Sequence, residues 1–124
     1  MKFSIDHIGI AVENLEESIS LYEALGFEEH SKETVASENV NVAMFPLENE
    51  SKVELLEPTN ADSVMAKFLN KRGPGIHHIC LRVEDIHKAI EQLKSKNVRL
   101  INEEPKVGAH NCLVVFIHPK STGG

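Results

Sequence analysis

The sequence is poor in cysteine, and its two cysteines, Cys80 and Cys112, lie far apart in apolar runs. Neither their number nor their spacing fits a disulfide framework or a cysteine-based zinc site. We therefore expect two buried thiols in a reducing compartment, and we predict a cytoplasmic protein.

An excess of positive charge and long apolar runs are also missing. The chain has 13 Lys and Arg against 19 Asp and Glu, a net charge of −6, which argues against nucleic acid or an anionic membrane as a partner. No apolar run approaches the roughly 18 residues of a membrane span, and no signal peptide is recognisable. The composition, 41% hydrophobic and 26% charged, is typical of a soluble globular domain.

What the sequence does contain is a repeat. Residues 6–15 (DHIGIAVENL) match residues 77–86 (HHICLRVEDI) at a constant offset, and the match places His7 on His78. A repeat of this regularity indicates one structural unit used twice, with a histidine at the same place in each copy.

Each copy begins with a strand pattern. Residues 3–12 alternate between apolar side chains on one face and His7, Gly9 and Ala11 on the other, which predicts a β-strand. Because the second face carries small residues and a histidine, we expect it to line open space.

Each strand leads into a helix with a capping residue in front of it. Asn14 is the predicted N-cap of the first helix, and Gly26 fits the left-handed position behind it. In the second copy Asp85 and Asn97 occupy these two places, and Asn is the usual substitute for Gly there. Because the same capping pattern occurs in both copies, it supports the repeat on physical grounds.

Strands follow the helix in each copy. The first copy has strand patterns at 27–34, 40–45 and 52–56, the last two forming a hairpin, and the second copy has them at 98–102 and 112–117. Each copy is therefore a βαβββ unit. We predict an α+β fold in which two tandem units form a curved mixed sheet around a metal site.

We interpret residues 1–124 as a single domain. Repeat one spans about 3–58, a linker helix about 61–72, and repeat two about 75–124. The last strand of the second unit is missing from this sequence. An unpaired sheet edge invites pairing, so we expect a homodimer, or a partner chain that covers the edge.

Three side chains in this pattern are candidate metal ligands. Taken singly, each histidine of the chain fits a structural role better than a ligand role, but the repeat would bring His7 and His78 to one point. Glu54 lies in an apolar strand, where a carboxylate is either exposed at an edge or held by a cation. Two imidazoles and a carboxylate suit Co²⁺, Mn²⁺, Ni²⁺, Fe²⁺ or Zn²⁺ better than Ca²⁺.

The paired βαβββ repeat with a histidine on each first strand resembles the vicinal-oxygen-chelate fold of the glyoxalase/bleomycin-resistance/dioxygenase superfamily. Within it, nearly the whole chain resembles the methylmalonyl-CoA epimerase family. The segments that carry the resemblance are 5–12 (IDHIGIAV), 54–59 (ELLEPT), 66–69 (AKFL), 75–79 (GIHHI), 103–110 (EEPKVGAH) and 116–121 (FIHPKS).

The resemblance implies metal-dependent epimerisation of the acyl-CoA substrate methylmalonyl-CoA at C2. It places metal ligands on His7, Glu54 and His78, and a fourth, a glutamate, past the end of this chain. The divalent metal would stabilise the enolate that forms when C2 loses its proton.

Epimerisation needs an acid–base group on each side of C2, and the resemblance does not name both here. A catalytic glutamate that some family members carry on the first hairpin arm falls on Val42. Glu54 is a ligand and a poor free base, so the reserve candidates are Asn41, His110 and Lys120.

Two lysines, Lys106 and Lys120, are candidate contacts for the CoA phosphates, although solvated surface lysines fit the sequence as well. Two other functions stay open at this point. One is a glyoxalase-I-like lyase or isomerase, and the other is a non-catalytic protein of the same fold that binds a metal or a small molecule.

Overall fold

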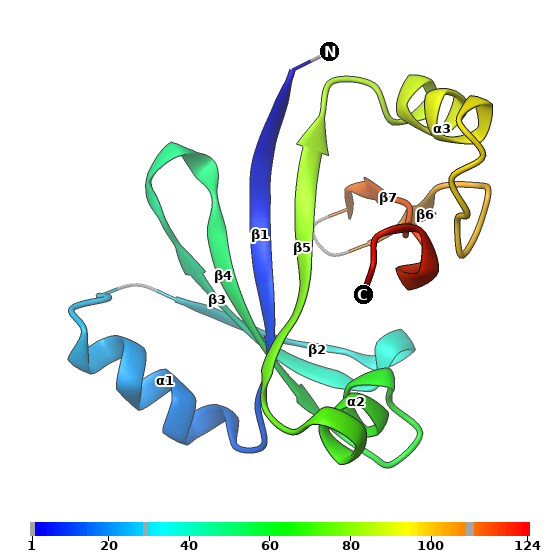
Figure 1. The fold of residues 1–124 in the computed structure, drawn as a ribbon. Helices are drawn as coiled ribbons and strands as arrows, with labels where there is room; N and C mark the ends of the chain where they lie inside the picture. The colour runs from blue at the N-terminus through cyan, green and yellow to red at the C-terminus, as the bar shows by residue number, and fades with distance from the viewer. Residues whose placement is uncertain (1, 29, 109–110) are drawn as a thin grey trace. The chain divides into compact units, whose positions relative to one another are not determined.

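The computed structural model describes residues 2–28, 30–108 and 111–124 (Figure 1). These residues form two compact units, a larger one of residues 4–82 and a smaller one of residues 83–124 with the first residues of the chain. Each unit is described by itself. The assignment of residues 1–124 to a single domain with two repeats stays a prediction.

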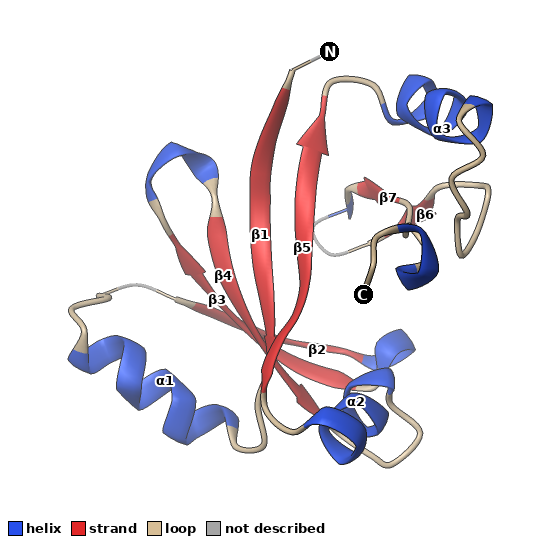
Figure 2. Ribbon diagram, viewed as in Figure 1, coloured by secondary structure: helices blue, strands red, loops and turns tan. Residues whose placement is uncertain are grey.

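The larger unit contains a five-stranded mixed sheet with the order β2-β3-β4-β1-β5 (Figure 2). Strands β1 and β4 run parallel, whereas β2, β3 and β4 pair antiparallel. The strands are β1 Phe3–Ala11, β2 Ser31–Val35, β3 Val40–Pro46, β4 Lys52–Pro58 and β5 Gly75–Val83. The predicted α+β class with a mixed sheet is confirmed, and the hairpin of β3 and β4 lies where the sequence predicts it.

Helices α1 (Leu15–Ala24) and α2 (Val64–Arg72) pack against opposite faces of this sheet. Successive residues of β3 enter two different cores, because neighbouring side chains of a strand point to opposite faces. The core under α1 contains Val12, Leu15, Ile19, Ala43, Phe45 and Leu55. The core under α2 contains Ala11, Val40, Val42, Met44, Leu56 and Met65.

The second face of β1 differs from the prediction of open space. Ala11 is fully buried under α2, and Gly9 is also buried. His7 is half-buried, so the face is closed toward the C-terminal end of the strand and more accessible near the histidine. The small residues Gly9 and Ala11 on this face of β1 make room for packed neighbours.

The predicted helix ends are confirmed in both copies. The side chain of Asn14 accepts a hydrogen bond from the backbone N–H of Glu17 at 3.0 Å, and Asp85 accepts two from the first turn of α3 (Ile86–Ser95) at 3.0 and 3.2 Å. Behind the helices, Gly26 has a φ of 110° and Asn97 a φ of 60°. These residues adopt the positive φ that ends a helix.

Asn14→Ala is expected to lower the free energy of unfolding by about 1 kcal/mol, because the N–H of Glu17 loses its side-chain acceptor. Urea denaturation followed by circular dichroism measures the change. The exposed Glu23→Gln on the same helix is the control, with an expected change within about 0.5 kcal/mol. Equal midpoints for the two variants would contradict the capping role of Asn14.

The smaller unit has less regular structure than the sequence predicts. Its strands are β6 Lys106–Val107 and β7 Leu113–Val114, and the predicted strand at 98–102 is reduced to a bridge between Leu100 and Ile117. The predicted strand at 112–117 is likewise too long. Among the described residues of this unit Ile90 is the only buried hydrophobic residue, so long strands would have little core to cover.

Two further predictions are tested by the structure. The expectation of two buried thiols is wrong, since Cys112 is exposed and Cys80 is only partly buried. Among the described residues, no helix has the length and apolar character needed to cross a membrane.

Candidate metal centre

Three strands of the larger unit bring the predicted ligands together: β1 carries His7, β4 carries Glu54 and β5 carries His78. In the parallel pairing of β1 with β4, Glu54 lies opposite Gly9, two residues beyond His7. Since side chains two residues apart share a face, His7 and Glu54 lie on the same face of the sheet, the one that α2 covers farther along.

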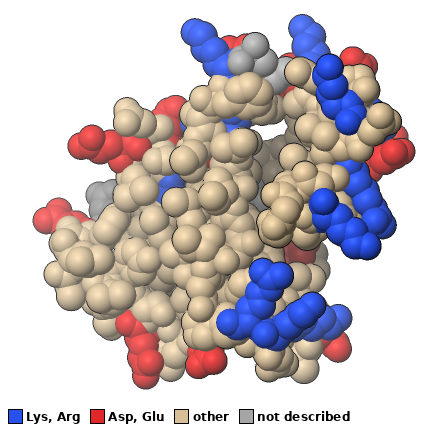
Figure 3. All heavy atoms as spheres, in the orientation of Figure 1, with Lys and Arg blue, Asp and Glu red and all other residues tan. Residues whose placement is uncertain are grey.

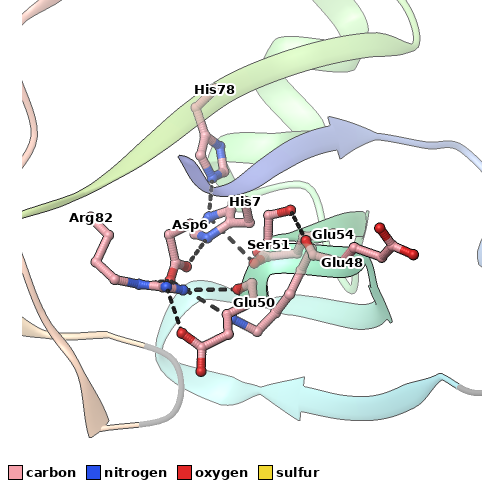
Figure 4. A network of polar contacts seen from close by, with 9 residues as sticks. Asp6, His7, Glu48, Glu50, Ser51, Glu54, His78 and Arg82 are labelled. Atoms are coloured by element: carbon pink, nitrogen blue, oxygen red, sulfur yellow. Dashed lines mark hydrogen bonds and ion pairs between the residues drawn. The ribbon is translucent and has the colours of Figure 1, made fainter. Parts of the chain in front are cut away.

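The donor atoms of these three residues lie within 4.8 Å of one another. Nε2 of His7 is 3.0 Å from Nε2 of His78 and 3.4 Å from Oε2 of Glu54 (Figure 4). Glu54 is only 7% exposed, which is rare for a carboxylate unless a partner compensates its charge.

These distances fit a divalent transition metal. Metal–ligand bonds of about 2.0–2.2 Å place neighbouring ligand atoms roughly 3.0–3.5 Å apart in octahedral or tetrahedral geometry. The distances from His7 to the other two residues lie in this range. Three protein ligands leave positions open for water or substrate, as in catalytic centres. The structure therefore contains a candidate His–Glu metal-binding group.

Gly9 makes room for the imidazole of His78. A Cβ atom added at Gly9 would lie 2.2 Å from Cε1 and 2.6 Å from Nε2 of His78, well inside van der Waals contact. The ring of His78 therefore occupies the space above the backbone of β1 that any other residue at position 9 would fill.

The imidazole of His78 is neutral at pH 7. Burial, together with the neighbouring His7 and His77, lowers the pKa of His78 to about 4. A neutral imidazole keeps a lone pair on one ring nitrogen, which is the form that binds metals.

His7 is held from its other side by Asp6. Nδ1 of His7 lies 2.7 Å from Oδ2 of Asp6, and Nη2 and Nε of Arg82 donate to Oδ1 of Asp6 at 2.6 and 3.2 Å. Burial raises the pKa of the Asp6 carboxyl, but the hydrogen bonds with His7 and Arg82 and the charge of Lys52 outweigh it and lower the pKa. Asp6 is therefore an anion that accepts from His7.

His78 has a corresponding neighbour in His77. The two Nδ1 atoms lie 2.8 Å apart, and the ring of His77 packs edge-to-face on Phe68 of α2 with centroids 4.9 Å apart. Each ligand histidine thus contacts the side chain of the residue immediately before it.

A second group of potential ligands, Asp6, His7 and Cys80, also comes within 4.8 Å. Arg82 and Lys52 lie 2.6 and 3.7 Å from Oδ1 of Asp6. These positive charges repel a cation from that group, so the site with Glu54 is the better metal centre.

The reserve acid–base candidates do not join this centre among the described residues. Asn41 lies on β3 next to Val42, so its side chain is on the face opposite the core under α2. There it donates to Glu57 at 3.2 Å and accepts from Thr34 at 2.7 Å. As a neutral amide with these partners, Asn41 does not supply a catalytic base, and this candidate is incorrect.

The other sequence candidates lie elsewhere. His110 falls outside the described residues. Lys106 and Lys120 are exposed residues of the smaller unit, and their contact with CoA stays a prediction. In the larger unit, Figure 3 shows Lys and Arg side chains gathered over α2, where Lys67, Lys71 and Arg72 are exposed.

Sequence reasoning missed the residues that surround the ligands. Asp6 and His77 occupy equivalent places in the repeat, each directly before a ligand histidine, and that equivalence was the available signal. The requirement for Gly9 and the contact of Arg82 with Asp6 depend on how β5 lies beside β1 (Figure 1). Sequence spacing alone does not carry that information.

Comparison with known proteins shows the family of this chain. Residues 6–116 match the model of the glyoxalase/bleomycin resistance protein/dioxygenase superfamily. The chain is 43% identical to the mitochondrial methylmalonyl-CoA epimerase of Dictyostelium discoideum over 122 residues, which are 97% of this chain and 73% of that protein. It is 41% identical to an ethylmalonyl-CoA/methylmalonyl-CoA epimerase of Cereibacter sphaeroides over 123 residues, 97% of this chain and 91% of that protein.

The fold is also similar to that of a solved enzyme. A structure of methylmalonyl-CoA epimerase in complex with methylmalonyl-CoA and NH4+ superposes with a TM-score of 0.88 at 36% identity. The match covers 97% of this chain and 88% of that one. Because relatives include mitochondrial proteins, the cytoplasmic location stays a prediction.

Proposed function

The chain belongs to the glyoxalase/bleomycin resistance protein/dioxygenase superfamily, and on this basis we propose that it is a metal-dependent methylmalonyl-CoA epimerase. The observation that carries the proposal is the convergence of His7, Glu54 and His78 from three strands. The identity of 41–43% with epimerases of malonyl-type thioesters supports the substrate class.

The three ligands give the centre a suitable charge. Two neutral imidazoles and one carboxylate contribute a single negative charge, so a divalent ion in this site keeps a net positive charge. Such an ion, one of Co²⁺, Mn²⁺, Ni²⁺, Fe²⁺ or Zn²⁺, supplies Lewis acidity to the thioester and carboxylate oxygens of the substrate. The burial of Glu54 limits competition by water at its carboxylate.

The protein side chains have distinct roles in this proposal. His7, Glu54 and His78 would hold the ion, and removal of the C2 proton from one face with return of a proton to the opposite face inverts the centre. Val42 is aliphatic and therefore supplies no acid–base group, and it packs in the core under α2. The basic side chains on α2 and the predicted Lys106 and Lys120 are candidates for the CoA phosphates.

The proposal also includes the domain organisation and the oligomeric state. We propose that residues 1–124 form a single vicinal-oxygen-chelate domain of two βαβββ units. We also propose that the protein is a homodimer, which sedimentation equilibrium measures directly. A monodisperse monomer at micromolar concentration would contradict the dimer.

Proton exchange at C2 tests the activity. Protein stripped with a chelator and reloaded with Co²⁺ is expected to exchange the C2 proton of methylmalonyl-CoA for deuterium in D₂O, as followed by mass spectrometry. The chelated protein is the control and is expected to exchange no faster than buffer.

The same experiment separates the alternatives. Metal-loaded protein that leaves the C2 proton in place but converts a hemithioacetal would be a glyoxalase-I-like enzyme. Metal-loaded protein that acts on neither compound would be a binding protein of the same fold.

A further inference from the structure

We propose that Asp6 and His77 are positioning residues of the metal centre, each holding through its far ring nitrogen the histidine that follows it in the sequence. The inference rests on the proposed metal-dependent function. It concerns two residues that occupy equivalent places in the repeat but differ chemically, since one is a carboxylate and the other an imidazole.

The contacts of the two pairs are parallel. In each ligand histidine Nε2 faces the centre, with His7 and His78 joined at 3.0 Å. In each, Nδ1 faces the preceding residue, at 2.7 Å from Asp6 Oδ2 and at 2.8 Å from His77 Nδ1. An imidazole held at one nitrogen has its ring plane fixed and presents the other nitrogen in a fixed direction.

The positioning residues are themselves anchored. Arg82 of β5 donates twice to Oδ1 of Asp6 and also to the backbone carbonyl oxygen of Glu50 at 2.9 Å (Figure 4). This leaves Oδ2 directed at His7. His77 packs on Phe68, which ties its ring to α2. Both positions are therefore determined by packing and ion pairing within the larger unit.

The two pairs respond differently to metal because their acceptors differ. Asp6 is an acceptor only, so His7 carries a proton on Nδ1, and in the neutral tautomer with that proton Nε2 of His7 carries the lone pair. In the metal-free protein His78 therefore donates from Nε2–H to His7, and its Nδ1 accepts from Nδ1–H of His77. These proton positions follow from the hydrogen-bond network.

Metal binding is expected to reverse the direction of the hydrogen bond between His78 and His77. When Nε2 of His78 gives its lone pair to an ion, its proton must lie on Nδ1, which then donates to Nδ1 of His77. His77 in turn carries its proton on Nε2. One proton changes nitrogen on each of the two rings, so the number of bound protons on the pair stays the same.

Nitrogen-15 NMR of the imidazoles tests this exchange of tautomers. At pH 8, where ordinary imidazoles are neutral, addition of Zn²⁺ is expected to move the proton of His77 from Nδ1 to Nε2 and to leave His7 protonated at Nδ1. His87, exposed on α3, is the internal control and is expected to keep its tautomer. A His77 that keeps Nδ1–H in the zinc-loaded protein would overturn the proposal.

Zinc affinity tests the positioning directly. Asp6→Ala and His77→Phe each remove the partner of one Nδ1, and each is expected to weaken zinc binding about 10- to 100-fold in a competition titration with a chromophoric chelator. Asp6→Asn and His77→Gln keep an acceptor oxygen and are expected to recover part of the loss. Asp62→Ala, an exposed aspartate outside the site, is the matched control.

The outcomes separate this inference from the proposed function. If wild-type protein binds zinc and exchanges the C2 proton while all four variants bind zinc within twofold of it, the positioning roles are wrong and the function stands. If the variants lose affinity as expected but wild-type protein does not exchange the proton, the positioning roles stand and the function is wrong. A wild-type protein that binds none of Co²⁺, Mn²⁺, Ni²⁺, Fe²⁺ and Zn²⁺ would overturn both.

Discussion

His78→Ala is expected to weaken binding of Zn²⁺ or Co²⁺ by about 10²- to 10³-fold and to abolish metal-dependent exchange of the C2 proton. Four-ligand zinc sites bind with roughly 10–16 kcal/mol, so one ligand accounts for about 3–4 kcal/mol, which corresponds to this loss of affinity. Isothermal titration calorimetry measures it. Since the ring of His78 lies between His7 and His77, its removal also leaves His7 without its imidazole neighbour.

The free energy of unfolding of metal-free His78→Ala is expected to rise or to change very little. In the metal-free protein the pKa of His78 is lowered to about 4 by burial and by its histidine neighbours, so the ring is neutral and no buried charge is left unpaired when it is removed. His87→Ala on α3 is the matched control and is expected to bind metal like the wild type, because His87 is exposed. Equal affinity of the two variants would remove His78 from the centre.

The sequence predicts the helix caps and the hairpin better than the strands of the smaller unit. The caps at Asn14 and Asp85 and the hairpin of β3 and β4 are local signals that depend on neighbours within a few residues. They are confirmed. The strands predicted at 98–102 and 112–117 depend on partners and on a core, and the described residues there form only short pieces.

The residues of the candidate site likewise divide into those that the sequence pattern predicts and those whose contacts only the structure shows. Symmetry of the repeat makes His7 and His78 candidate ligands, and an acidic residue in an apolar strand makes Glu54 a candidate, because both are properties of the pattern. The order of the strands in space is not a property of the sequence pattern. The contacts of Arg82 with Asp6 and of His78 with Gly9 follow from β5 lying next to β1. Asn41 shows the converse error, since a residue beside a candidate position lies on the other face of the sheet.

Gly9→Ala is expected to leave the protein folded but to weaken metal binding nearly as much as loss of His78. The new methyl group would lie 2.2–2.7 Å from three ring atoms of His78, and the ring can relieve the clash by turning out of the site. Forcing an additional carbon into a filled space costs about 1–3 kcal/mol, which urea denaturation measures. Gly108→Ala, whose added Cβ would meet only side-chain methyl groups of Val114 and a carbonyl at 3.2 Å or more, is the matched control.

A double-mutant cycle distinguishes this clash from a general effect on β1. In the His78→Ala background there is no ring for the new methyl group at position 9 to displace, so Gly9→Ala is expected to cost less than about 0.5 kcal/mol and to leave the residual metal affinity unchanged. If Gly9→Ala is equally destabilising with and without the ring, position 9 acts on the strand itself. A coupling between the two changes would instead establish that the glycine in the repeated motif is needed because the histidine of the other repeat occupies its side-chain space.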